Sequence, residues 1–321
     1  MKNISSNFKK RVIIFTLSFM LSFYSVSFAG APFTNVEGVG GGGLNPSANL
    51  AGAIHEPGGG LNGSNIVGKP NIAYWYVGIP SSDIFWNIFA TNISFFNRLE
   101  LGMSQSFANV SDPMEKAGLA GATDSTIHFS TYSAKLQLLK DGQFHPLVPA
   151  FSAGVIHKST DNKLADSLFR DDSSQDFYIV FDKLLYKNVG LPMPVSLNFG
   201  VRWTKGYSLG LQGFGNDYDE EIFGSIAVFL PWPENFPGKH LILSSEYRGK
   251  TNVGEDRHGR TMKNGRMFDV TLVWEATEKL SFIASYLNAG GSDDIYESSN
   301  NFHKNAKSLG HSMVFSVQYQ F

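Results

Sequence analysis

The chain ends in His311-Ser312-Met313-Val314-Phe315-Ser316-Val317-Gln318-Tyr319-Gln320-Phe321. Successive side chains of an extended strand point to opposite faces. One face of this segment therefore carries Met313, Phe315, Val317, Tyr319 and Phe321, and the other carries mostly serine and glutamine. An alternation of this length is typical of an amphipathic β-strand rather than a helix, which would scatter the apolar residues around its surface.

The same alternation recurs along most of the chain. Its clearest internal example runs from Val195 to Thr204, where Val195, Phe199 and Trp203 share one face and Arg202 lies on the other. Short turn signals alternate with long polar links between such runs, as they do in membrane β-barrels. Counted back from the C-terminus, the pattern predicts twelve strands, at 310–321, 279–288, 267–276, 240–250, 221–231, 195–206, 176–187, 147–158, 126–139, 98–109, 85–94 and 71–79.

Composition narrows the fold class further. The 321 residues are 42% hydrophobic and only 17% charged, with 33 Gly, 27 Phe and no Cys. The charged fraction is low for a soluble domain, where about a quarter of residues are charged. The mean hydropathy of -0.11 is too polar for a bundle of membrane helices. Without cysteine, the chain has no disulfide framework, no cysteine-ligated zinc and no thiol nucleophile.

The one long apolar run, Val12 to Phe28, follows Lys9, Lys10 and Arg11 and ends before Ala29-Gly30. This order is typical of a secretory signal peptide. We therefore expect a signal peptide at 1–29 with cleavage near Ala29, a Gly-rich segment at 30–70 and a barrel at 71–321. The alternative for the first segment is an uncleaved membrane anchor, because 17 residues reach the lower limit for a spanning helix.

An aromatic residue that closes a C-terminal amphipathic strand resembles the assembly signal of Gram-negative outer-membrane barrels. The residues that carry this likeness are Phe315, Val317, Tyr319 and Phe321. The resemblance implies the outer membrane as location, with its lipids and the barrel assembly machinery as partners. The alternative is the last strand of a soluble β-sandwich. The fold class predicted here is all-β: a transmembrane antiparallel β-barrel of about 12 strands.

Charged residues recur on the polar face of the predicted strands. Because a lipid-facing Lys or Arg costs about 2 to 4 kcal/mol at the membrane midplane, these side chains are expected to point into the lumen. They could pair with one another and fix the shape of the barrel, or they could line a solute path. Phe and Trp are expected outward, near the lipid interfaces. The predicted lumen-lining residues are Glu100, Lys135, Asp182, Arg202, Glu246, Arg248 and Asp269.

Residues 30–70 are dominated by Gly, Asn and Pro, and Gly38, Gly40 and Gly43 fit the spacing G-x-G-x-x-G. That spacing indicates a dinucleotide site only between a strand and a helix, and no helical pattern follows here. We expect instead an irregular segment in the lumen or at its periplasmic mouth, because glycine allows close backbone packing. The acids in the polar loops lack EF-hand spacing. No cofactor, metal site or nucleic-acid partner is predicted.

This opening resembles an uncharacterised family of proteobacterial outer-membrane proteins, described as a domain of unknown function, that begins with an E-G-x-x-G-G-G-L-x-P motif and has an R-x-E-L strand. The R-x-E-L strand matches Arg98 to Leu101, whereas the stretch from Pro57 to Lys69 departs from the family pattern. The family implies an outer-membrane barrel and supplies no substrate. The motif residues, a possible plug, are Glu37, Gly38, Gly41, Gly42, Gly43, Leu44 and Pro46.

A weaker resemblance is to barrels that carry hydrophobic compounds past an N-terminal hatch containing Asn-Pro-Ala, here Asn45-Pro46-Ser47-Ala48. We expect a channel or uptake protein for small solutes, hydrophobic ones included. The alternative is a non-conducting structural or partner-binding barrel. A remote alternative is a lipid hydrolase that uses His157 and Ser159. Because Thr160-Asp161 follow them and no third residue orients the histidine, no catalytic residue is predicted.

Overall fold

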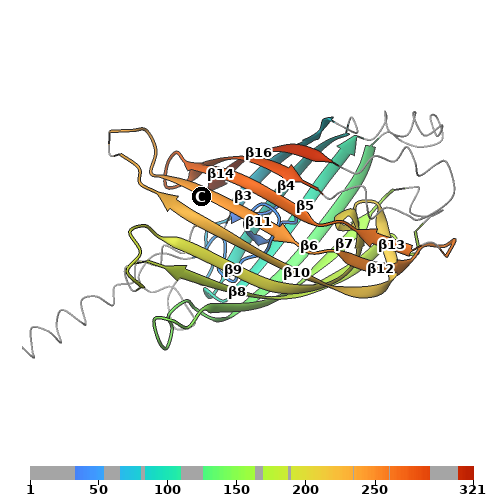
Figure 1. Cartoon of the computed structure of the whole chain (residues 1–321), viewed down its shortest axis with the longest axis horizontal. Helices are drawn as coiled ribbons and strands as arrows, with labels where there is room; N and C mark the ends of the chain where they lie inside the picture. Colours follow the sequence, from blue (N-terminus) through green and yellow to red (C-terminus); the bar gives the residue numbers. More distant parts are fainter. Residues whose placement is uncertain are drawn as a thin grey trace, which may run out of the picture.

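The computed structural model describes residues 33–53, 66–80, 84–109, 126–162, 169–186, 189–233, 235–259, 261–289 and 310–321. The signal peptide predicted at 1–29, most of the stretch from Pro57 to Lys69 and the links at 110–125 and 290–309 lie outside these residues. A closed antiparallel barrel of twelve strands makes up most of the described chain (Figure 1). Its strands are β3 (Asn71–Ile79), β4 (Ile84–Phe95), β5 (Leu99–Asn109), β6 (Thr126–Leu139), β7 (Ala150–Thr160), β8 (Ser173–Leu185), β9 (Val195–Tyr207), β10 (Gly213–Leu230), β11 (His240–Arg248), β14 (Met267–Glu275), β15 (Leu280–Asn288) and β16 (His311–Gln320).

The predicted barrel and its twelve strands are confirmed. The last strand closes the barrel, because β16 pairs with β3 from Gln320 opposite Asn71 to Met313 opposite Gly78. The turn at Phe96–Asn97 is tight, and both residues have positive φ angles of 55° and 51°. Such angles belong to the hairpin turns whose twist matches that of the flanking strands.

The strands place their apolar side chains on the outside of the barrel and their polar side chains inside, the reverse of a soluble protein. In β16, Phe315 and Val317 are 47% and 43% exposed, whereas Ser316 and Gln318 are 3% and 2% exposed. The apolar face of the alternation therefore forms the outer surface, and the polar face lines the interior. A soluble sandwich buries its apolar faces, so this arrangement is that of a barrel surrounded by lipid.

The expectation that Phe and Trp lie outward holds at exposed residues such as Phe89 and Phe199 but is wrong at several others. Trp75, Trp86, Phe129 and Phe223 point inward and are at most 8% exposed. Trp75 and its neighbours in β3 read Tyr74-Trp75-Tyr76-Val77, with apolar residues on both faces. Alternation cannot assign a face where both faces are apolar, and the inner face here packs on other apolar groups in the lumen.

Two predicted links also contain strands. β10 begins at Gly213 rather than near residue 221, and its pairing with β9 is interrupted between Phe214 and Asp219. Part of that extension packs instead on a small hairpin, β12 (Thr251–Glu255) and β13 (Thr261–Asn264). Asp217, Asp219 and Glu220 of the predicted link therefore lie in β10. Glu221, which follows them, is 5% exposed.

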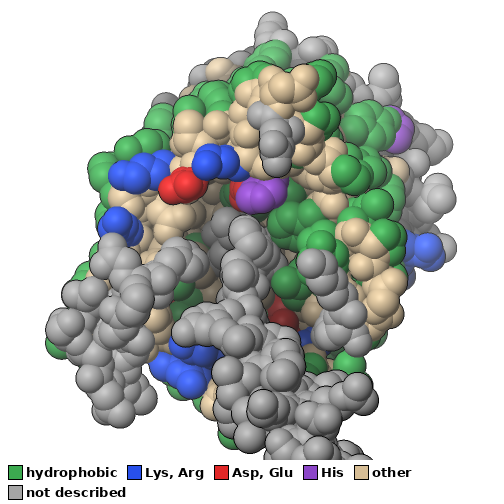
Figure 2. Space-filling view, turned by 90° about the vertical axis from the view of Figure 1, so that its left-hand side faces the viewer, with side chains coloured by type: hydrophobic (Ala, Val, Ile, Leu, Met, Phe, Trp, Pro, Cys, Tyr) green, Lys and Arg blue, Asp and Glu red, His purple; other side chains and the backbone are tan. Residues whose placement is uncertain are grey.

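The chain ends at the end of the barrel that carries the turns between β4 and β5 and between β14 and β15. Figure 2 looks at this end: hydrophobic side chains cover much of the flank, and charged side chains lie around the mouth. Within the described part of the chain, no helix is long and apolar enough to span a membrane.

Candidate functional site: a peptide segment inside the barrel

Residues 33–53, named here the luminal segment, lie inside the barrel (Figure 1, blue). The segment contains a short hairpin, β1 (Phe33–Thr34) and β2 (Gly40–Gly41). At one side of the lumen its Thr34 is held by Trp75 and Gln318, whose side-chain N–H groups donate to the Thr34 carbonyl at 2.9 and 3.1 Å. Eight-stranded barrels are filled by side chains alone. This wider barrel is filled in part by its own N-terminal peptide.

Three carboxylates on the barrel wall hold the backbone of the luminal segment. Glu246 accepts from the backbone N–H groups of Gly43, Leu44 and Asn45, the last at 2.7 Å. Glu100 accepts from Gly40 and Ala51, and Asp182 from Ala48 and Asn49, with three of these four distances at 2.7 to 2.8 Å and the fourth at 3.3 Å. Hydrogen bonds to an ionised acceptor are roughly twice as strong as neutral ones. The segment is therefore fixed mainly through its backbone.

Of these three carboxylates, Glu100 forms an ion pair with a cation of the described chain. The ammonium of Lys135 lies 3.0 Å from Glu100 and also donates to the carbonyls of Gly40 and Asn49, at 2.8 and 2.7 Å. Glu246 lies instead beside a second acid, because its own backbone N–H donates to Asp269 at 2.9 Å. Backbone N–H groups of the luminal segment therefore supply three hydrogen bonds to Glu246, whereas Asp182 also accepts from the side chains of Ser47, Asn49 and Asn198.

The one acid of the luminal segment enters a cluster of buried charges. Glu37 lies 2.5 Å from Lys158 and 2.8 Å from Arg202. Asp176 and Glu221 complete the cluster, at 2.7 Å from Lys158 and 2.6 Å from Arg248 respectively. The cluster thus pairs three cations with three acids, and each of these side chains is at most 6% exposed.

The environment of Glu37 acts on its pKa in two directions. Burial raises the pKa of this carboxyl, but the positive charges of Arg202, Lys158 and Arg248 outweigh burial. The pKa of Glu37 therefore lies well below its usual range, which favours the ionised carboxylate. Glu37 is thus a counter-ion for Lys158 and Arg202 of the barrel wall.

The glycines of the luminal segment allow its backbone to touch the wall. A methyl group at Gly102 of β5 would overlap the carbonyl oxygen of Gly38, and one at Gly42 would overlap the Glu246 carboxylate. Gly38 itself has a φ of 77°, which L side chains rarely adopt. Gly43 differs, because a methyl group there would meet its nearest atom at 3.5 Å, an ordinary contact.

These contacts predict different outcomes for two matched substitutions. Gly102→Ala is expected to lower the free energy of unfolding by about 1 to 3 kcal/mol, the usual cost of overpacking, because the Gly38 carbonyl must move. Gly43→Ala has room and is expected to cost less than about 0.5 kcal/mol. Urea titration of both variants in lipid vesicles measures the difference, and equal stabilities would contradict the close approach described here.

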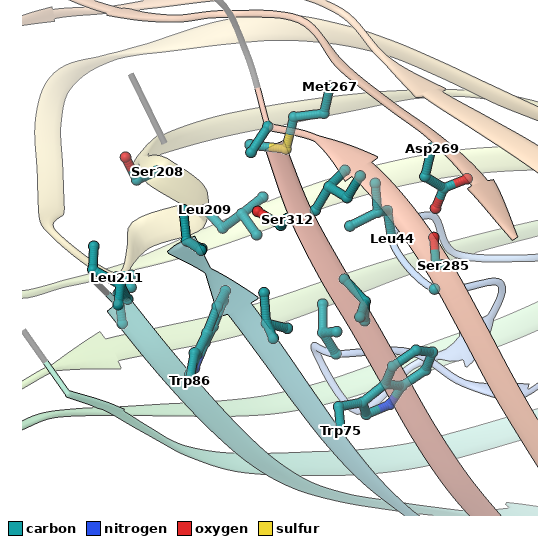
Figure 3. Close-up of a pocket in the computed structure, with 18 of the residues that line it drawn as sticks. Leu44, Trp75, Trp86, Ser208, Leu209, Leu211, Met267, Asp269, Ser285 and Ser312 are labelled. Carbon is teal, nitrogen blue, oxygen red and sulfur yellow. The ribbon is translucent and has the colours of Figure 1, made fainter. Parts of the chain in front are cut away.

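Two cavities flank the turn of the luminal segment. The first, of about 80 Å³, lies toward the end with the long links and is mainly apolar (Figure 3). The second, of about 90 Å³, lies toward the short turns and is lined largely by small and polar residues such as Ser196, Asn198 and Ser225. Gly43 and Thr271 line both. The luminal segment thus divides the interior into an apolar and a more polar chamber.

The loop between β9 and β10 covers the apolar cavity. It contains a 3-10 turn, η3 (Ser208–Gly210), and Leu209 and Leu211 line the cavity across from Leu44 (Figure 3). Lys158 and Thr160 of β7 fix this loop through the carbonyls of Leu209 and Leu211, at 3.0 and 2.9 Å. Leu209 has a φ of 66°, a strained value for leucine.

The structure places all seven predicted lumen residues in the interior, each at most 4% exposed. Pairing among them, one of the two expected uses, is present, and the structure adds a contact that the sequence did not predict. Lys135 and Glu100 pair, but both also bind the luminal segment, as do Asp182, Glu246 and Arg202. Among the motif residues, Glu37 provides the charge, Gly43 and Leu44 donate backbone N–H groups, and Pro46 accepts from Asn198 at 3.1 Å.

Three residues of the charge cluster are not among the predicted lumen-lining residues: Lys158, Asp176 and Glu221. The alternation held the signal for each, since Lys158 shares a face with the inward Ser152, and Asp176 with Asp182. His157 lies on the opposite face of β7, where its Nδ1 atom is 3.2 Å from Gln175.

No group of three or more His, Cys, Asp or Glu side chains is placed to hold a metal ion in the described part of the chain. A search among curated proteins found no match.

Several solved barrel structures are similar to this chain. The KdgM porin aligns with a TM-score of 0.43 and 11% identity, over 78% of this chain and 99% of its own. The NanC porin gives 0.44 and 7%, over 78% and 98%. The COG4313 outer membrane channel from Pseudomonas putida F1 gives 0.42 and 12%, over 84% of this chain and 100% of its own.

The R-x-E-L strand and the glycine-rich opening contact each other in the structure. Glu100 of the strand accepts a hydrogen bond from the backbone N–H of Gly40. The family model described as "Protein of unknown function (DUF3034)" matches residues 30–298. The chain therefore belongs to the DUF3034 family.

Proposed function

We propose that this protein is an outer-membrane channel of a Gram-negative bacterium that takes up small solutes, hydrophobic ones included, and that the luminal segment is its plug. The apolar outer surface supports a location in lipid, and the aromatic C-terminal strand, with Phe315, Val317, Tyr319 and Phe321, supports insertion by the barrel assembly machinery. The expected signal peptide at 1–29 supports export.

One observation carries the proposal: the plug separates two cavities and is held mostly through its backbone N–H groups. Water or a polar solute can take the place of these backbone hydrogen bonds to the wall carboxylates. A shift of the turn from Gly41 to Asn45 would join the apolar chamber to the polar one. Such a path suits a small molecule with both apolar and polar parts.

The second candidate is a structural or partner-binding barrel that conducts nothing. The charge cluster around Glu37 favours it, because breaking a buried ion pair costs about 3 to 5 kcal/mol and a plug held this firmly could be permanent. In that case the outer loops or the mouth shown in Figure 2 would bind an envelope partner. Lipid hydrolysis has less support, since His157 lies beside Gln175 on the outer face.

Planar-bilayer recording of the full chain and of a variant lacking residues 30–69 tests the proposal. We expect small or rare openings from the full chain and stable, larger conductance from the deletion variant, because removal of the plug joins the chambers. Heat-modifiable gel migration checks that both barrels are folded. Silence from two folded barrels would favour the second candidate, as would a fixed partner recovered by crosslinking.

A further inference from the structure

One buried ammonium group joins the luminal segment to the covering loop, residues 208–212. The Nζ atom of Lys158 lies 2.5 Å from the Glu37 carboxylate and 2.7 Å from that of Asp176, and it donates to the Leu209 carbonyl at 3.0 Å. A lysine ammonium has three N–H groups to donate. Its three acceptors here belong to three different elements: the luminal segment, β8 and the covering loop. Lys158 therefore holds an inner and an outer part of the molecule at once.

The covering loop depends on such anchors for its shape. The three residues of η3 have positive φ angles of 49°, 66° and 98°. Only glycine adopts such angles readily, and a backbone strained in this way persists where the surrounding structure holds it. Two of the anchors come from β7: Lys158 binds the carbonyl of Leu209, and Thr160 binds that of Leu211. Loss of an anchor is therefore expected to free the loop.

Movement of the covering loop is expected to weaken the hold on the luminal segment. Leu209 lies over the apolar cavity (Figure 3), and Lys158 and Glu37 are 0% and 1% exposed. An outward shift of the loop removes the Leu209 carbonyl from Lys158 and lets water reach the ion pair with Glu37. The attraction between two charges falls as the dielectric constant around them rises. The ion pair that anchors the luminal segment therefore weakens when the loop opens.

The reverse effect has the same sign. Departure of Glu37 leaves the three cations of the charge cluster facing only two acids. A buried charge without a counter-ion is unfavourable unless water reaches it. An open loop admits water to Lys158, so departure of Glu37 favours the open loop. Coupling between two sites is reciprocal, and both directions here agree.

We propose that Lys158 couples the covering loop to the luminal segment, so that displacement of the loop loosens the plug. A solute that pushes the loop aside at the end with the long links would release the anchor at Glu37 before it reaches the plug. Lys158 is a positioning residue in this role, because it acts through Glu37 and Leu209. The inference rests on the proposed function in one respect, since it treats the luminal segment as a plug that moves.

Thiol labelling tests the coupling, because the chain has no cysteine and each reporter variant then carries a single thiol. Leu211→Cys reports on the covering loop, since this side chain lines the apolar cavity. Val39→Cys reports on the luminal segment, at a position that is 0% exposed. The full chain in lipid nanodiscs is labelled with a water-soluble maleimide, and the labelling rate measures how often each thiol becomes exposed.

The first comparison perturbs the luminal segment and reads the loop. Glu37→Gln is expected to raise the labelling rate of Leu211→Cys at least about fivefold, the lower end of usual coupling between sites. In the presence of Lys158→Met the same substitution is expected to change that rate less than about twofold, because effects within one network are not additive. The two Lys158→Met variants are compared only with each other.

The second comparison perturbs the loop and reads the luminal segment. Thr160→Val removes the hydroxyl that donates to the Leu211 carbonyl at 2.9 Å and keeps the shape of the side chain. It is expected to raise the labelling rate of Val39→Cys about twofold or more. This comparison needs no substitution at Lys158, so it decides the matter even if Lys158→Met does not fold.

Lys135→Met is the matched control. Lys135 is also buried and also binds the luminal segment, but in the described chain it donates to the carbonyls of Gly40 and Asn49 rather than to the covering loop. Its replacement is expected to raise labelling of Val39→Cys and to leave labelling of Leu211→Cys within about twofold. Heat-modifiable gel migration checks that each variant is folded.

Three results would overturn the proposal: an effect of Glu37→Gln on the loop that is the same with and without Lys158, a response of the loop to Lys135→Met as large as that to Glu37→Gln, or no response of Val39→Cys to Thr160→Val. The outcome is separable from that of the bilayer experiment. Coupled labelling without conductance would remove the channel function and keep the coupling. Conductance without coupled labelling would keep the channel and remove the coupling.

Discussion

Replacement of Glu100, Asp182 and Glu246 together by alanine is expected to convert a mostly closed channel into one that is open most of the time. The three carboxylates accept seven backbone N–H groups of the luminal segment. Hydrogen bonds to charged groups contribute about 1.5 to 3 kcal/mol each in proteins. Luminal water offsets part of this loss once the segment moves.

Even one lost carboxylate is expected to have a visible effect. A loss of about 3 kcal/mol changes the ratio of closed to open molecules by a factor of about 100. Glu246→Ala, which leaves three N–H groups without their acceptor, is therefore expected to raise open probability in planar bilayers strongly. Glu246→Gln is expected to be intermediate, because the amide oxygen still accepts hydrogen bonds but carries no full charge.

Glu278→Ala is the control for these recordings. Its carboxylate is 82% exposed and pairs with Lys239 outside the lumen, so its removal should leave conductance unchanged. The prediction fails if the triple variant migrates as a folded barrel and still conducts no more than the wild-type protein. That result would show that the charge cluster at Glu37 alone retains the segment.

Glu37→Gln is expected to lower the free energy of unfolding by about 3 kcal/mol, the low end of the range for breaking a buried ion pair. The substitution leaves Lys158, Arg202 and Arg248 facing only Asp176 and Glu221, one buried positive charge in excess. The low end applies because water can reach the cations once the segment loosens. Urea titration in lipid vesicles, followed by tryptophan fluorescence, measures the change.

A second substitution separates the charge imbalance from a loss of shape. Glu37→Gln with Lys158→Met removes one acid and one cation, and the remaining two pairs are neutral. The double variant is expected to recover at least half of the stability lost in Glu37→Gln, because residues in one ion-pair network are not additive. If the double variant loses the sum of both single effects, the two side chains act independently and the cluster does not anchor the segment.

The fold could be predicted from the sequence because the residues of each strand alternate with the lipid and the interior that its two faces contact. In β9 and β16, strict alternation matched an apolar outer face and a polar inner face, and both strands fall within one or two residues of their expected bounds. Where both faces of a strand are apolar, as around Trp75, alternation does not predict which face points inward. It also missed the start of β10, which leaves the β9 pairing and packs on β12.

The inward charges followed from the same alternation, but their partners did not. Gly40 and Glu100 are 60 residues apart, and Gly43 and Glu246 are 203 apart. Local pattern carries no information on contacts at such separations. Nor does the pattern show why Gly102 is small: the backbone of Gly38 lies against it.

The sequence by itself thus determined the closed, lipid-facing barrel, its strand number and the inward position of its charges. Those properties depend on whether each side chain faces lipid or the interior. The alternation of apolar and polar residues within a single strand already indicates which of the two each side chain faces. Only the tertiary structure decided that the charges bind a peptide as well as each other, and that an apolar cavity lies beyond that peptide. Both depend on closure of the barrel, which brings β5, β8 and β11 to face one luminal segment.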